Sequence, residues 1–88
     1  MYRWELDDSV QPDFDSLGPP VRMTVTNFMD AVVLVDPLEY QRHPGEPADA
    51  NKLLRTLHFG LRHEGLITFL IYPPDDLVLV VRIQWLGE

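Results

Sequence analysis

The sequence has no cysteine, no long apolar run and few basic residues. Without cysteine the chain can form no disulfide, no thiolate metal site and no cysteine nucleophile. The longest apolar stretches, Ala31–Val35 and Leu77–Val81, fall far short of the roughly 20 residues that span a bilayer. The first residues contain no apolar run typical of a signal peptide, so we expect a soluble cytoplasmic protein that does not contact a membrane.

The basic residues are scarce and unevenly distributed. Fourteen acids against seven Lys and Arg give a net charge of −7. The first 50 residues hold ten of the acids and three arginines, so all of the net charge lies there. The remaining residues hold four acids and four bases, which are Lys52, Arg55, Arg62 and Arg82. A protein that binds nucleic acid without the help of a partner protein is normally basic, because counterion release from phosphates drives its affinity. An anion site is therefore expected in the second half.

The first half of the chain predicts one strand and two helices. Alternating aromatic and polar residues indicate a strand over residues 2–6. Asp-Asp-Ser at 7–9 offers N-cap side chains for a short helix over 10–17. Apolar residues at helical spacing predict a longer helix over 21–35, which the following Asp-Pro ends.

The second half predicts a loop and three strands. Residues 38–51 contain two prolines, a glycine and no periodicity, which indicates a loop. Strands are predicted over 53–59, 66–72 and 77–85, with a turn at Pro-Pro-Asp-Asp. The middle strand is apolar on both faces, which is typical of a central strand covered by helices. We therefore expect one α+β domain over 1–88, in which an N-terminal strand and two helices pack on a small antiparallel sheet.

This β-α-α-β-β-β order resembles the RelE/ParE superfamily of toxin–antitoxin proteins. The segment WELDDSVQPDFDSLGPPVRMTVTNFMDAVVLVDP is similar to that family's first strand and helical hairpin. The segment LLRTLHFGLRHEGLITFLIYPPDDLVLVVRIQWLG is similar to its last three strands. The resemblance implies the toxin of a type II pair, inhibited by a cognate antitoxin that wraps across the helices and sheet. RelE-like members cut mRNA on the ribosome, whereas ParE-like members inhibit DNA gyrase.

The resemblance also implies which residues form the site. Arg55 and Arg82 match strand positions where RelE-like toxins place catalytic cations, and Lys52 and Arg62 would bind phosphates. His58 and His63 are the candidates for acid and base, since histidine titrates near neutral pH. Strand alternation, however, puts Arg55 on one face with Leu57 and Phe59, and His58 on the other. The competing interpretation is that these are ordinary surface residues of a small sheet.

Two functions remain open from the sequence. The first is a ribosome-dependent endoribonuclease that acts on mRNA. The second is a non-enzymatic degenerate toxin or ParE-like module that acts through protein contacts, as favoured by the acidic first half and by the absence of Tyr or His after Trp85. We expect a homodimer where the antitoxin is missing.

Some further candidates concern the long loop and metal binding. Tyr40, Arg42 and His43 form either a substrate or partner loop, or a solvated one. His43, His58 and His63 lack the spacing of a metal site, so we expect no metal and no cofactor.

Overall fold

The elements follow one another in the predicted order of strand, two helices and three strands. The computed structural model describes residues 1–35, 37 and 53–87. The N-terminal elements are β1 (Arg3–Leu6), α1 (Gln11–Asp15) and α2 (Pro19–Leu34). The C-terminal ones are β2 (Leu53–Phe59), β3 (Gly65–Tyr72), the 3-10 turn Pro73–Asp75 and β4 (Leu77–Trp85). The predicted loop over 38–51, with Tyr40, Arg42 and His43, lies outside the described residues, as does Lys52.

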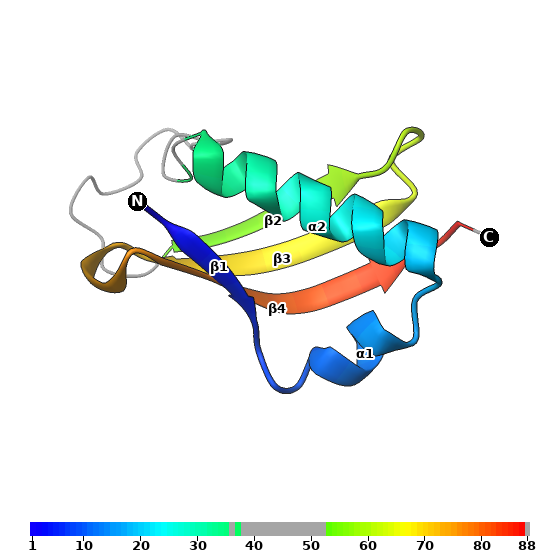
Figure 1. Cartoon of the computed structure of the whole chain (residues 1–88), viewed down its shortest axis with the longest axis horizontal. Helices are drawn as coiled ribbons and strands as arrows, with labels where there is room; N and C mark the ends of the chain where they lie inside the picture. The colour runs from blue at the N-terminus through cyan, green and yellow to red at the C-terminus, as the bar shows by residue number, and fades with distance from the viewer. Residues whose placement is uncertain (36, 38–52, 88) are drawn as a thin grey trace.

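The sheet has the strand order β1-β4-β3-β2 and is mixed (Figure 1). β3 pairs antiparallel with β2 and with β4, as predicted. β1 pairs parallel with β4, from Arg3 opposite Leu77 to Leu6 opposite Val80, so the three C-terminal strands form the predicted antiparallel sheet and the first strand makes it mixed. The physical reason is the connection: β1 and β2 point the same way at opposite edges, and parallel strands are joined by a helical crossover.

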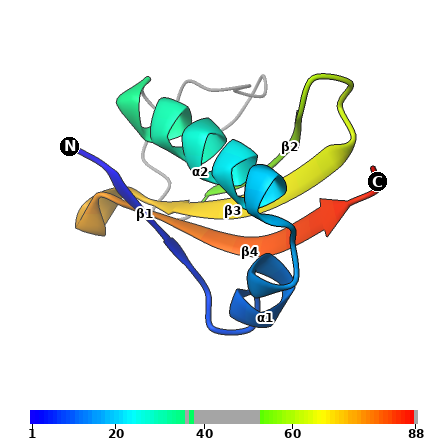
Figure 2. The same ribbon diagram turned by 45° about the vertical axis from the view of Figure 1, so that its right-hand side comes forward.

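One face of the sheet and helix α2 enclose the core. Val25, Met29 and Val32 of α2 are buried against the sheet, as the helical spacing predicts. The buried strand residues that meet them are Leu57, Phe59, Ile67, Phe69, Ile71, Val78, Val80 and Ile83. Figures 1 and 2 show α2 lying along this face, while α1 lies beside β4 at the edge of the sheet. Helix α2 therefore covers the face and α1 only its edge, whereas both helices had been expected to cover it.

The turn between β1 and α1 uses its polar side chains differently from the prediction. The N-cap residue of α1 is Val10, and no side chain caps the helix. Asp7 instead accepts hydrogen bonds from the amide of Ser9 (3.1 Å) and from its hydroxyl. The hydroxyl bond, and then the amide bond, lower the pKa of Asp7 below its ordinary value. Asp7 thus closes an Asx-type turn, which competes with helix capping for the same side chain.

Candidate functional site

The face of the sheet opposite α2 is exposed or half-buried, and we call it the open face. Along β2 the exposed and buried residues alternate from Leu54 onward, and along β3 half-buried and buried residues alternate. The open face consists of Leu54, Thr56, His58, Leu66, Thr68, Leu70, Tyr72, Leu77, Leu79, Arg82 and Gln84. The expected central position of β3 is confirmed, with one of its faces toward α2 and the other on the open face.

Arg82 reaches the open face because β4 contains a β-bulge. Phe69 lies opposite Val80, whereas its neighbour Thr68 lies opposite Arg82. Val81 is thus the extra residue between two consecutive pairs. The bulge puts the exposed Arg82 side chain at the end of a row with Thr68 and Thr56, whose hydroxyl oxygens lie 3.1 Å apart.

His58 lies on the next row of the open face. It is opposite Leu66, which is opposite Gln84. The spacing of strands and residues in a sheet puts the Cα atoms of His58 and Arg82 roughly 12 Å apart. Two long side chains at this separation can approach one small group, such as a phosphodiester, from both sides.

His63 is brought to His58 by the turn between β2 and β3. The two imidazole rings meet edge to face, with centroids 5.8 Å apart. Gly60 and His63 both have positive φ, at 96° and 58°, and the His63 amide donates to the Gly60 oxygen at 3.2 Å. The Arg62 amide donates to Glu64 Oε1 at 2.7 Å, and the Arg62 side chain is exposed. The turn therefore places two imidazoles and a guanidinium at one end of the open face. Sequence reasoning treated these three residues separately.

Arg55 does not belong to this arrangement. It is only 2% exposed and lies on the face of β2 that carries Leu57 and Phe59, beneath α2. Its Nη1 donates to the Leu54 backbone oxygen at 3.5 Å. Arg55 and Arg82 thus lie on opposite faces of the sheet, and the expectation that they act as a pair in one site is corrected here. The predicted separation of Arg55 from His58 is confirmed.

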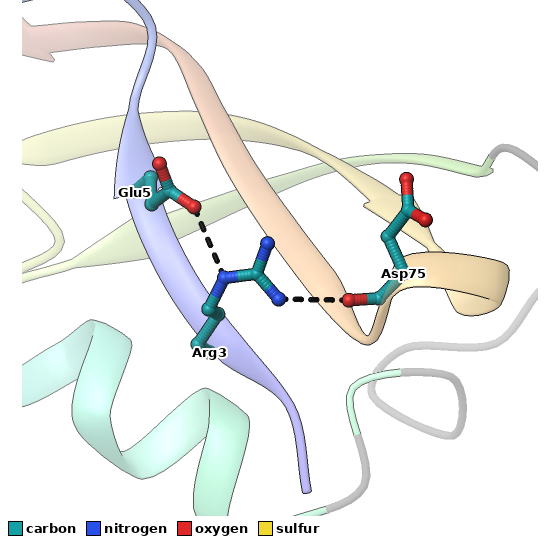
Figure 3. A network of polar contacts seen from close by, with 3 residues as sticks. All are labelled: Arg3, Glu5 and Asp75. Carbon is teal, nitrogen blue, oxygen red and sulfur yellow. Dashed lines mark hydrogen bonds and ion pairs between the residues drawn. The ribbon is translucent and has the colours of Figure 1, made fainter.

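The other half of the open face is apolar. Leu54, Leu70 and Leu79 form one row across β2, β3 and β4, and Leu54 is 57% exposed. This row ends at Glu5 on β1, the partner of Leu79. Arg3, the neighbouring open-face residue of β1, donates from Nε to Glu5 (3.1 Å) and from Nη1 to the Asp75 backbone oxygen (2.8 Å), as Figure 3 shows. Arg3 is therefore held at the edge, far from Arg82.

Two other kinds of feature are absent from the described residues. Among the described residues, no three His, Asp or Glu side chains lie close enough to hold a metal ion. None of the described helices combines the length and the apolar character needed to cross a membrane.

Comparison with solved structures identifies the architecture. The isolated E. coli RelE toxin superimposes with a TM-score of 0.68 at 16% identity, covering 100% of this chain and 87% of that one. The fold is RelE-like. The intact E. coli RelBE toxin–antitoxin complex gives 0.68 at 15% identity, with both chains fully covered. The archaeal RelE–RelB complex from Pyrococcus horikoshii gives 0.61 at 18% identity, covering 99% and 97%.

No protein family model matches the chain, and no curated protein matches it. The RelE-like fold is thus shown by structure at identities of 15–18%, where the fold can be shared without the chemistry. Function must be argued from the residues of the site.

Proposed function

We propose that this protein is the toxin component of a type II toxin–antitoxin pair, neutralised by a cognate antitoxin. The RelE-like fold extends over the whole chain, and two of the similar structures are complexes of a toxin with its antitoxin. The described chain carries exposed apolar residues that a partner could cover. These are Met23, Leu34, Val35, Leu54, Leu61 and Leu86.

We further propose that the active form cleaves ribosome-bound mRNA on the open face. The observation that carries this proposal is that Arg82 and His58 are exposed on the same face, with His63 and Arg62 at its end. Cleavage by transfer to the 2′-hydroxyl needs a base, an acid and a cation beside the phosphorane. Arg82 supplies the cation, and His58 and His63 move the protons.

The remaining cations have supporting roles. Arg62 binds a neighbouring phosphate, and Lys52, which directly precedes β2, is assigned the same task. Arg55 touches no RNA on this face, because its side chain is buried beneath α2. We therefore leave it out of the catalytic set and assign it to the stability of β2.

The test is induced expression followed by primer extension on cellular mRNA. Arg82→Ala should lower cleavage by about 10²–10³-fold, the usual effect of losing one group that stabilises the transition-state charge. Arg3→Ala is the matched control, since Arg3 is an exposed arginine at the far edge of the same face. Equal cleavage by wild type and Arg82→Ala would refute this role, and loss in both variants would point to a nonspecific charge effect.

A non-enzymatic module is the second candidate, and the leucine row favours it. Leu54, Leu70 and Leu79 offer an apolar surface with only Glu5 beside it on β1, in a chain of net charge −7. Such a surface suits a protein partner better than rRNA. In this case growth arrest would survive Arg82→Ala and be lost on Leu70→Asp, with no mRNA cleavage in either. Light scattering of the isolated chain tests the expected homodimer: the mass of a dimer would support it, and the mass of a monomer would contradict it.

A further inference from the structure

The bulge in β4 puts Arg82 on the open face, where strand alternation alone would not place it. A regular strand that buries Val78 and Val80 would also bury residue 82, on the face covered by α2. A guanidinium there would need a partner, because burying an unpaired charge is costly. In the structure the inserted Val81 shifts the pairing by one residue, and Arg82 is exposed on the open face instead.

The fold itself does not need the inserted residue. Without Val81 the strand would read Leu-Val-Leu-Val-Arg-Ile-Gln-Trp, in which open and buried positions alternate without interruption. Val78, Val80 and Ile83 would keep the buried face that they have now. Arg82 would also keep the open face, opposite Thr68. The regular strand thus preserves the core and the charge, and differs only in the local path of the backbone.

We propose that the Val81 bulge is a positioning device that aims the Arg82 guanidinium at the scissile phosphate of the RNA. This inference rests on the proposed cleavage of mRNA. A bulge bends its strand and increases the local twist, and bulges are common beside active sites, where they re-aim a side chain. Misplacing a catalytic group by about 1 Å can cost about 10²-fold in rate. Val81 is therefore a positioning residue for Arg82 and does not itself touch the substrate.

The direct test deletes Val81 and measures mRNA cleavage in a purified translation system. We expect the deleted protein to fold, with a melting temperature equal to or above that of the wild type, and to cleave about 10²-fold more slowly. Adding Arg82→Ala to the deletion should then cause little further loss, because a misaimed guanidinium has little left to contribute. Asn27→Ala, exposed on α2 and away from the open face, is the control that should match wild type.

A second variant covers the case in which the deletion does not fold. The exchange Val81→Arg with Arg82→Val keeps the length and composition of β4 and moves the guanidinium to the inserted position. It should bind the antitoxin normally and cleave as slowly as Arg82→Ala.

The outcomes separate this inference from the proposed function. If the folded deletion variant or the exchange variant cleaves like wild type, the bulge has no positioning role and the inference is overturned. If Arg82→Ala causes a further loss of 10²-fold or more in the deletion background, Arg82 works without the bulge, and the inference fails again. If wild type itself cleaves no mRNA, the proposed function fails and the inference fails with it.

Discussion

Gly65 at the start of β3 leaves no room for a side chain. A Cβ atom at this position would lie 2.3 Å from Cζ of Phe59 and 2.4 Å from its Cε1. The Phe59 ring cannot move away freely, since it lies between Phe28 and Trp85, with centroids 6.0 and 5.7 Å away. To restore an ordinary carbon–carbon contact of 3.4 Å, the ring must shift by about 1 Å in a close-packed core.

Gly65→Ala should therefore destabilise the protein although it adds only one methyl group. Overpacking of this kind costs about 1–3 kcal/mol, and we expect about 2 kcal/mol. For a domain of this size that lowers the melting temperature by about 8–16 °C. Urea unfolding followed by tryptophan fluorescence measures the loss. The near-ultraviolet circular dichroism should also change, because the ring that moves contacts Trp85.

Two further variants decide whether the clash is the cause. Gly18→Ala is the control, because the nearest side-chain atom to its Cβ is 3.8 Å away, and it should cost less than about 1 kcal/mol. Phe59→Leu should be less harmful in the Gly65→Ala background than in wild type, since the smaller side chain relieves the contact. If Gly65→Ala unfolds within about 0.5 kcal/mol of wild type, the ring has free space and the reasoning is wrong.

Two other predictions concern the helix and the first turn. Phe28→Ala should destabilise the protein by about 2–3 kcal/mol in urea unfolding. This is less than the ~3–5 kcal/mol lost with a fully buried Phe, because the Phe28 ring is only half-buried against Phe59. An unchanged unfolding midpoint would contradict the packing of α2. The lowered pKa of Asp7 adds stability above pH 3.8 that is lost as the pH falls through the lowered value. Ser9→Ala should therefore reduce stability at neutral pH and not below the pKa of folded Asp7, which melting curves between pH 2 and 7 would show; an equal deficit at every pH would exclude Asp7 as its source.

Local signals predicted the elements well. The bounds of β2 and β4 were predicted to the residue, since Gly60 ends β2 and the Pro-Pro-Asp-Asp turn precedes β4. Helix α2 begins two residues earlier than predicted, because Pro19 and Pro20 are tolerated in a first helical turn. The parallel pairing of β1 could not be predicted, because it depends on how α2 crosses the sheet.

The site was predicted only in part, because sequence patterns report on residues within one element, whereas the site joins residues from different elements. Alternation along β2 correctly separated Arg55 from His58, because face assignment within one strand is local. The proximity of His58 and His63 depends on a turn with positive φ at Gly60 and at His63 itself. Gly60 was a visible sign of a turn. A histidine with positive φ is uncommon enough that nothing in the sequence indicated it.

Arg82 shows how one inserted residue can mislead an analysis of the sequence. Its assignment to the site came from the resemblance, whereas continuous alternation from Val78 would have placed it on the same face of the sheet as Arg55, which is covered by α2. Leu77–Val81 is a continuous apolar run in the sequence, so the break in alternation is visible only in the structure, where the half-buried Val81 separates the buried Val80 from the exposed Arg82. An interruption of this kind requires either a buried charge or a bulge, and the cost of burying an unpaired guanidinium favours the bulge. The same reasoning places the two arginines of the expected pair on opposite faces of the sheet. Alternation along β2 is unbroken and Arg55 is buried, whereas alternation along β4 is broken by the bulge and Arg82 is exposed.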